Sequence, residues 1–191
     1  MDGAEATSAA KAELRAELSA RRRARPPEEL ERARTAIRRA VLERAAGLDC
    51  VAAYVPLRTE PGSLELLAEL GGRGVRVLVP LTQPDRDLDW THWSPGVASE
   101  PLGPKAIEAA ALVLVPALAV ALDGTRLGRG GGSYDRALRR ADPAASVAAL
   151  VFDDEVRAVL PSDPWDVRVG AAVTPAGWAG LGGNADFPSV R

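Results

Sequence analysis

The segment GTRLGRGGGSYDRALRR, residues 124–140, places four glycines within five consecutive positions, directly before a stretch of helical composition. Arginines flank these glycines on both sides. Successive backbone N–H groups in a glycine-rich turn can converge on an anion, and the start of a following helix adds its dipole. The segment therefore predicts a phosphate cradle. On these grounds alone, a turn without a ligand is the alternative.

Neither of the two commonest phosphate-binding motifs fits this segment. A Walker A loop ends in Lys followed by Ser or Thr, and that pair is missing. The dinucleotide fingerprint needs three spaced glycines, and Ser133 stands at the third position after Gly128 and Gly130. The glycine stretch also does not begin directly at the end of the preceding apolar run, as the dinucleotide fingerprint does. A cradle here would be of another kind.

The order of the residues in this segment is a more specific signal than the number of its glycines. The run DGTRLGRGGGSYDR, after the apolar ALVLVPALAV, resembles the signature of the 5-formyltetrahydrofolate cyclo-ligase family. KAELR (11–15), AAYVPLRTE (52–60) and LPSDPWD (160–166) resemble the family's ATP-contacting helix, pterin loop and metal-binding segment. The positions that match the signature are Gly124, Arg126, Leu127, Gly128, Arg129, Gly130, Gly132, Tyr134, Asp135 and Arg136.

This resemblance implies a ligase of folate and one-carbon metabolism. Such an enzyme uses ATP and Mg²⁺ to convert 5-formyltetrahydrofolate to 5,10-methenyltetrahydrofolate, and releases ADP and phosphate. Phosphorylation turns the formamide oxygen into a good leaving group, and the N10 amine then closes the ring. The protein must mainly position the phosphates and neutralise their charge.

The resemblance also implies roles for single residues. Lys11 and Arg129 would be catalytic, Glu60 would accept hydrogen bonds from the pterin, and Asp135 and Asp166 would hold Mg²⁺, which prefers oxygen ligands. The expected nucleotide-binding residues are Lys11, Arg15, Arg126, Leu127, Gly128, Arg129, Gly130, Gly131, Gly132, Ser133 and Tyr134. The expected folate-binding residues are Val55, Glu60, Arg129, Gly132 and Ser133.

The three acids each have a structural alternative. Asp135 could only complement the dipole of its helix, Asp166 could be a turn residue after Pro164, and Glu60 could be an exposed loop acid. The metal role of Asp135 and Asp166 and the pterin role of Glu60 therefore rest on the resemblance.

The sequence departs from the family's pattern in three places. Ser133 stands where the family usually has an aromatic side chain, and could instead cap the following helix. Trp165 replaces a commonly polar residue before the metal aspartate, and PGS follows Glu60 where the family usually has an acidic or β-branched stretch with threonine. These departures leave open a related ATP-binding enzyme with another substrate. Trp90 and Trp93 are candidates either for stacking on the folate or for core packing.

Alternating helix and strand patterns position these residues. We expect helices over 8–25, from Pro27 to about Gly47, over 63–70 and over 133–141, with Ser63 as an N-cap. We expect strands over 50–55, 75–80, 88–93, 110–118, 146–152 and 169–174. With the resemblance, this order predicts one three-layer α/β/α, Rossmann-like domain, residues 1–191, with a largely parallel sheet and an N-terminal helical pair. Residues 1–7 and 176–191 are expected to be loosely ordered.

Composition excludes several classes of protein. The chain has 191 residues, 47% hydrophobic and 4% aromatic, and carries a net charge of -2. That charge predicts no affinity for nucleic acid or membranes. The single cysteine and the acidic start without an apolar segment predict a cytoplasmic protein. We expect a monomer that takes the folate with or without a polyglutamate tail. An RNA-binding module built on the arginine-rich helices is a weaker alternative, because glutamates interleave with the arginines.

Overall fold

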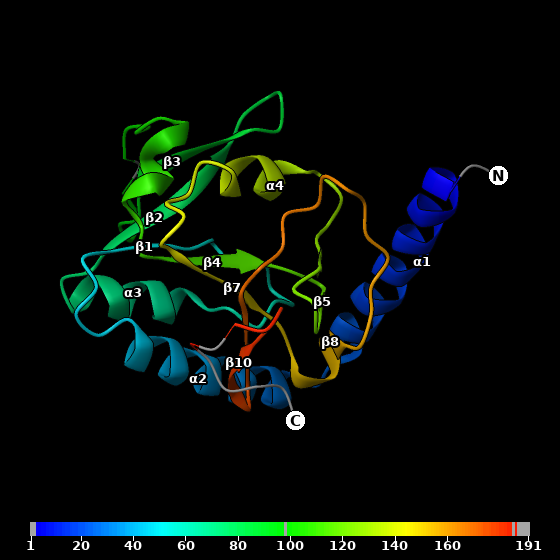
Figure 1. Ribbon diagram of the computed structural model, residues 1–191. Helices are drawn as coiled ribbons and strands as arrows, with labels where there is room; N and C mark the ends of the chain where they lie inside the picture. The colour runs from blue at the N-terminus through cyan, green and yellow to red at the C-terminus, as the bar shows by residue number, and fades with distance from the viewer. Residues whose placement is uncertain (1–2, 98, 185, 187–191) are drawn as a thin grey trace.

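The computed structural model describes residues 3–97, 99–184 and 186. Seven of the strands in this described part form one sheet, in which five parallel strands lie between two antiparallel edge strands (Figure 1). From edge to edge the strands are β10 (Gly177–Gly180), β9 (Ala171–Thr174), β7 (Ser146–Leu150), β4 (Leu112–Pro116), β1 (Cys50–Ala52), β2 (Arg76–Thr82) and β3 (Leu88–His92).

Helices cover both faces of this sheet. The helices α2 (Pro27–Arg44) and α3 (Leu64–Gly72) bury Ile37 and Leu67 against one face. The short helix α4 (Ser133–Leu138) and the 3-10 helix η1 (Pro104–Ala109) bury Leu138 and Ile107 against the other. Neighbouring residues of a strand enter opposite cores, as the pleat requires. The predicted three-layer fold with a largely parallel sheet is confirmed.

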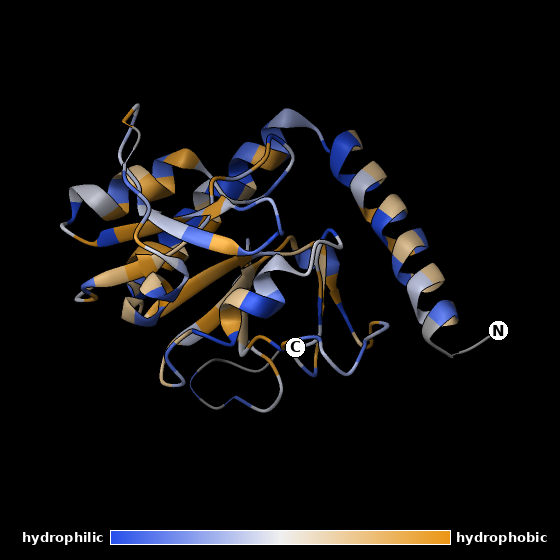
Figure 2. Ribbon diagram, turned by 90° about the horizontal axis from the view of Figure 1, so that it is seen from above, coloured by the Kyte–Doolittle hydropathy of each residue, from blue (hydrophilic) through white to orange (hydrophobic). Residues whose placement is uncertain are grey.

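The first helix, α1 (Gly3–Ala24), lies apart from both helix layers (Figure 2). It packs on a second, small sheet made of β6 (Arg126–Leu127), β5 (Ala119–Ala121) and β8 (Val156–Arg157), through Leu18. Its buried residues Lys11, Leu18 and Arg22 recur at helical spacing, so one face of the helix meets the protein. The two N-terminal helices are therefore present but cover different surfaces.

A buried ion pair fixes the C-terminal half of α1. Arg22 donates to Glu155 Oε1 and Oε2 at 2.7 and 2.6 Å and to the carbonyl oxygen of Ala117 at 2.6 Å. Glu155, in the 3-10 helix η2 (Asp153–Glu155), also accepts from the N–H of Phe152 at 2.9 Å. Because both charges are buried, their mutual pairing is needed to offset the cost of desolvation.

Helix boundaries agree with the sequence at some ends and differ at others. Ser63 caps α3 by accepting from the N–H of Leu66 at 3.2 Å, as expected. Gly132, not Ser133, is the N-cap of α4, and this helix ends at Leu138 rather than at 141. Beyond Leu138 the N–H groups of Arg140 and Ala141 donate to carbonyl oxygens three residues earlier, so the α-helical pattern does not continue. Parts of the two termini that were expected to be loosely ordered form regular structure, since α1 begins at Gly3 and β10 pairs with β9. Residues 1–2, 185 and 187–191 lie outside the described residues.

None of the helices in the described ranges combines the length and the apolar character that crossing a membrane would require.

Candidate functional site

A cavity of about 460 Å³ lies at the carboxyl ends of the parallel strands β1, β2 and β4. Ligands commonly bind at this edge of open α/β sheets. Every residue that the sequence analysis assigned to the site lines this one cavity: Lys11, Arg15, Val55, Glu60, Arg126, Leu127, Gly128, Arg129, Gly130, Gly131, Gly132, Ser133, Tyr134, Asp135 and Asp166. Residues far apart in the chain thus meet at one cavity.

The loop from Gly128 to Gly132 has the character of an anion cradle. Among residues 3–97, 99–184 and 186, its backbone N–H groups find no hydrogen-bond acceptor. Arg15 Nε donates to the carbonyl oxygen of Gly128 at 2.8 Å, which ties the loop to α1. Gly130 has φ +95°, a conformation that L side chains rarely adopt. The loop therefore lines the cavity with N–H groups that have no acceptor in the described part of the chain, beside an arginine.

Lys11 joins α1 to the loop before β9. Its Nζ lies 2.6 Å from Asp163 Oδ2 and 2.5 Å from Asp166 Oδ2. Burial by itself would lower the pKa of Lys11, but hydrogen bonds and charge from the two carboxylates outweigh it, so the pKa is raised. The ammonium stays charged beside the cavity.

Arg126 is paired with the other predicted metal ligand. Its NH2 group donates to Asp135 Oδ1 at 2.8 Å, and the same oxygen accepts from the N–H of Val167 at 3.1 Å. The guanidinium also lies 6.0 Å from the centre of the Tyr134 ring. Two donors from different segments of the chain thereby orient Asp135. An acid that only complemented the dipole of its helix would not need such contacts.

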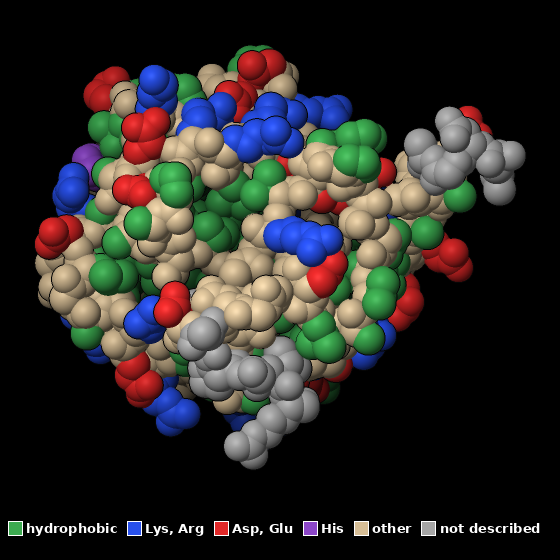
Figure 3. Space-filling model, in the orientation of Figure 1, with side chains coloured by type: hydrophobic (Ala, Val, Ile, Leu, Met, Phe, Trp, Pro, Cys, Tyr) green, Lys and Arg blue, Asp and Glu red, His purple; other side chains and the backbone are tan. Residues whose placement is uncertain are grey.

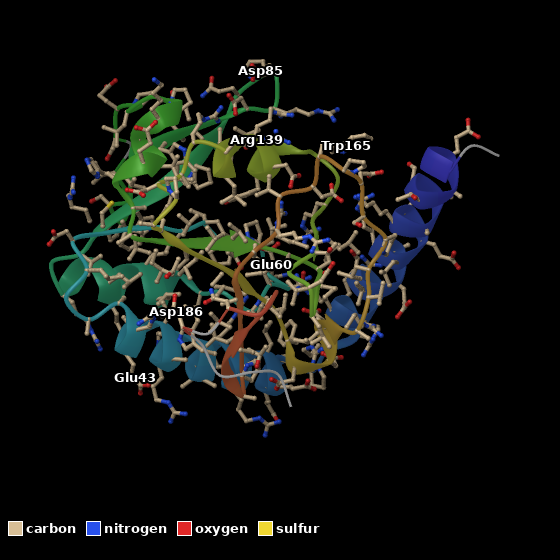
Figure 4. All side chains as sticks on the ribbon, viewed as in Figure 1. Glu43, Glu60, Asp85, Arg139, Trp165 and Asp186 are labelled. Carbon is tan, nitrogen blue, oxygen red and sulfur yellow. The ribbon has the colours of Figure 1, made fainter. Side chains whose placement is uncertain are left out.

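Glu60 is buried, with 4% of its surface exposed, so it is not an exposed loop acid. Its Oε1 lies 3.3 Å from Arg129 NH2, and its Oε2 accepts from the N–H of Leu57 at 2.8 Å. Arg34 of α2 holds the same loop by donating to the carbonyl oxygens of Arg58 and Glu60. In Figure 4 the label of Glu60 lies near the middle of the molecule. A buried carboxylate facing a cavity can accept hydrogen bonds from a ligand.

A second cavity, of about 450 Å³, borders the first. Both cavities are lined by Lys11, Arg15, Gly130, Gly132, Asp135 and Asp166. The second one also includes Asp163, Trp165, Arg136 and Arg139. Two ligands could thus approach the same glycine loop, one from each cavity.

The acids do not form a metal cage by themselves. Within the described ranges, no group of three or more His, Cys, Asp or Glu side chains could hold a metal ion. Asp135 and Asp166 instead contact Arg126 and Lys11. Mg²⁺ usually takes one or two carboxylates and completes its shell with phosphate oxygens and water. The residues present fit an ion that arrives with a phosphate ligand.

The sequence analysis did not identify Tyr54 and Asp163 as site residues. Tyr54 lines the first cavity, and its hydroxyl is buried without a hydrogen-bond partner in the described part of the chain. Burial raises the pKa of Tyr54 well above its usual value, so the group stays a potential donor. The only available signal was position: Tyr54 lies near the end of the expected strand 50–55, and Asp163 lies three residues before Asp166.

Of the tryptophans considered for folate stacking, Trp90 lies in the core and Trp93 packs against it. Trp90 is fully buried among Leu78, Ile107 and Leu138, and Trp93 packs against the core beneath α2 and α3. Core packing, the second of the two alternatives, accounts for both.

Known proteins resemble this chain over most of its length. The model of the 5-formyltetrahydrofolate cyclo-ligase family matches residues 7–175. A 5-formyltetrahydrofolate cyclo-ligase from Mycolicibacterium smegmatis is 43% identical over 141 residues, which cover 65% of this chain and 73% of that protein.

Two solved structures share the fold, and both are 5,10-methenyltetrahydrofolate synthetases. The one from Mycoplasma pneumoniae superposes with a TM-score of 0.75 at 20% identity, over 86% of this chain and 98% of that chain. The one from Aquifex aeolicus superposes with a TM-score of 0.70 at 25% identity, over 95% of this chain and 96% of that chain.

Proposed function

Because this chain belongs to the 5-formyltetrahydrofolate cyclo-ligase family, its activity is the family's ATP-dependent conversion of 5-formyltetrahydrofolate to 5,10-methenyltetrahydrofolate, and we propose that the reaction takes place at the glycine loop. The single observation that carries this proposal is the loop itself: Gly128 to Gly132 line the first cavity, Gly130 and Gly132 also line the second, and the N–H groups of the loop are unpaired among the described residues.

The reaction transfers a phosphoryl group and then closes a ring. The formyl oxygen attacks the γ-phosphorus of ATP and ADP departs. The N10 amine then attacks the activated carbon, phosphate leaves with the former formyl oxygen, and N10 gives up its proton. We propose that the folate occupies the cavity that contains Glu60, and that the nucleotide occupies the neighbouring cavity beside α1.

The chain's own side chains would bind and orient the two substrates. The amides of the loop, Lys11 and Arg15 would hold the phosphates, and Arg126 and Arg129 would offset their charge. Glu60 would accept hydrogen bonds from the pterin's amino and ring N–H groups. Asp135 and Asp166 would hold Mg²⁺, which supplies further neutralisation of the phosphate charge when bound.

The proposal extends to partners and location. We propose a monomer, because one chain supplies both cavities, and a cytoplasmic enzyme, because Cys50 is a free buried thiol. An RNA-binding role finds little support, since Arg21 and Arg22 of α1, and Arg25 directly after it, are held in ion pairs with Asp154 and Glu155.

A turnover assay tests the proposed function. The full chain should convert 5-formyltetrahydrofolate when both ATP and Mg²⁺ are present, and the absorbance of the methenyl product measures the conversion. Turnover should stop when either ATP or Mg²⁺ is omitted. Binding of Mg·ATP without any turnover would instead favour a related enzyme with another substrate, the alternative that Ser133 raises.

A further inference from the structure

Trp165 is an exposed aromatic side chain beside the second cavity. It lies in the connection between β8 and β9, directly before Asp166, and 59% of its surface is exposed. Isolated exposed apolar residues are common on protein surfaces. The position of Trp165 is less common, because Gly130 and Gly132 of the glycine loop line the same cavity, together with Lys11 and Arg15.

The backbone of Trp165 is held while its ring is left uncovered. The N–H of Asp166 donates to the carbonyl oxygen of Asp163 at 3.1 Å, and the N–H of Asp163 donates to Asp166 Oδ2 at 2.8 Å. Arg139 NH2 donates to the carbonyl oxygen of Trp165 at 3.1 Å. Figure 4 shows Trp165 and Arg139 near one another beside α4. A fixed backbone with an open indole is a preorganised surface for a flat ligand.

The surroundings of the ring favour an anionic ligand. Lys and Arg side chains gather over α4 in the view of Figure 3. Arg136 and Arg139 line the cavity together with Trp165. A ligand with a flat heteroaromatic ring and several negative charges matches this combination of indole, arginines and unpaired amides.

We propose that Trp165 stacks on the purine ring of the nucleotide whose phosphates lie on the Gly128–Gly132 loop. The proposal rests on the proposed function and adds to it the residue that binds the base. Aromatic stacking accepts any base, because every base has a π-face. The stack would remove ring surface of both partners from water and fix the nucleotide at the end opposite its reacting phosphate.

Binding measurements on the full chain separate the base from the phosphates. Calorimetric titrations compare Mg·ATP with Mg·tripolyphosphate, which has the phosphates and no base. Trp165→Ala should weaken ATP binding by about tenfold and leave tripolyphosphate binding unchanged. Trp165→Phe should keep most of the ATP affinity, because it keeps a ring. Val97→Ala, a change at another exposed apolar residue outside both cavities, is the matched control and should bind both ligands normally.

Fluorescence gives an independent readout. ATP should quench the emission of the wild-type protein, tripolyphosphate should not, and the quench should vanish in Trp165→Phe, where the other three tryptophans remain.

Four outcomes would overturn the assignment. Equal loss of ATP and tripolyphosphate affinity would mean that Trp165 supports the loop, and unchanged ATP affinity in Trp165→Ala would make it an ordinary surface residue. A raised KM for the folate with normal ATP affinity would place the ring on the other substrate. If the wild-type protein bound no ATP at all, the proposed function and this inference would fail together.

Discussion

The ammonium nitrogen of Lys11 and Asp166 Oδ2 lie 2.5 Å apart, although 155 positions separate the two residues in the chain. This contact joins α1 to the segment before β9 and brings both residues to the rim of the cavities. Asp163 completes the cluster from the same side. Three segments, of which the glycine loop is the third, therefore define one polar site.

Replacing Lys11 by Ala should raise the apparent KM for ATP while the fold stays intact. A hydrogen bond to a charged group contributes about 1.5–3 kcal/mol, so the expected rise is about 10- to 100-fold. Steady-state kinetics with ATP varied measures it, and circular dichroism checks the fold. Lys105→Ala, at the other lysine of the sequence, should behave as wild type. A normal KM in Lys11→Ala would remove Lys11 from the nucleotide site.

Breaking the buried Arg22–Glu155 pair should lower the free energy of unfolding. Both side chains are nearly inaccessible, 1% and 2% exposed, so Arg22→Ala leaves Glu155 buried without its partner. Such a loss costs about 3–5 kcal/mol. The double variant Arg22→Ala/Glu155→Ala should lose less than the sum of the two single variants. Urea titrations measure all three, and additive losses would mean that the pair is not coupled.

Adding a side chain at Gly130 should damage the loop more than adding one at Gly131. Gly130 has φ +95°, and a non-glycine residue there costs about 1–2 kcal/mol. Its Cβ would also lie 3.4 Å from Arg15 Cζ. Gly131 has no such φ, and its Cβ would meet only Ser133 Oγ, at 3.4 Å.

Gly130→Val should therefore weaken ATP binding strongly, while Gly131→Ala, the neighbouring control, has a smaller effect. Calorimetry measures the affinities, and thermal unfolding shows whether either variant is misfolded. Normal ATP affinity in Gly130→Val would exclude this loop as the phosphate site.

The sequence predicted the parts of the fold that depend on local pattern. Apolar runs such as 110–118 and 146–152 mark strands because a central parallel strand is buried on both faces. Pro26 and Pro27 mark a helix boundary because proline cannot continue a helix interior. The glycine loop and its neighbours were found by their order in the chain, and the cavity contains all of them.

Other features depend on contacts between distant segments. The pairing of Lys11 with Asp163 and of Arg22 with Glu155 joins residues 152 and 133 positions apart. Nothing local in those segments distinguishes a buried arginine from the solvated ones beside it. Strand β10 was missed because GWAG is short and glycine-rich, and it forms only by pairing with β9. Tertiary context decides such elements.

Replacing Ser133 by Tyr should strengthen folate binding. Ser133 lines the first cavity in place of the aromatic side chain that the family usually has. An aromatic contact contributes about 0.5–1.5 kcal/mol, so KM for 5-formyltetrahydrofolate should fall by about 2- to 10-fold. KM for ATP should change little, which is the internal control. An unchanged or higher folate KM would mean that the ring has no place in this cavity.

Acid should abolish the stabilisation that Asp87 provides. Arg140 NH2 lies 2.6 Å from Asp87 Oδ1, and this hydrogen bond holds the pKa of Asp87 below its ordinary value. A lowered folded-state pKa means that the stabilisation is fully present above the unfolded-state pKa and is lost as the pH falls through the folded-state pKa. Both side chains are partly exposed, so the pair contributes at most about 1 kcal/mol.

Asp87→Asn keeps an oxygen that can accept from the N–H of Leu88, as Asp87 does at 2.8 Å, and loses the charge. Urea titrations should show the variant less stable than wild type at about pH 7, with the difference closing as the pH falls through the folded-state pKa of Asp87. Glu108→Gln removes an acid that has no ion pair in the described part of the chain, and should show no such difference. A gap between Asp87→Asn and wild type that persisted unchanged in acid would show that charge on Asp87 is not its source, because protonation makes the carboxyl group as neutral as the amide.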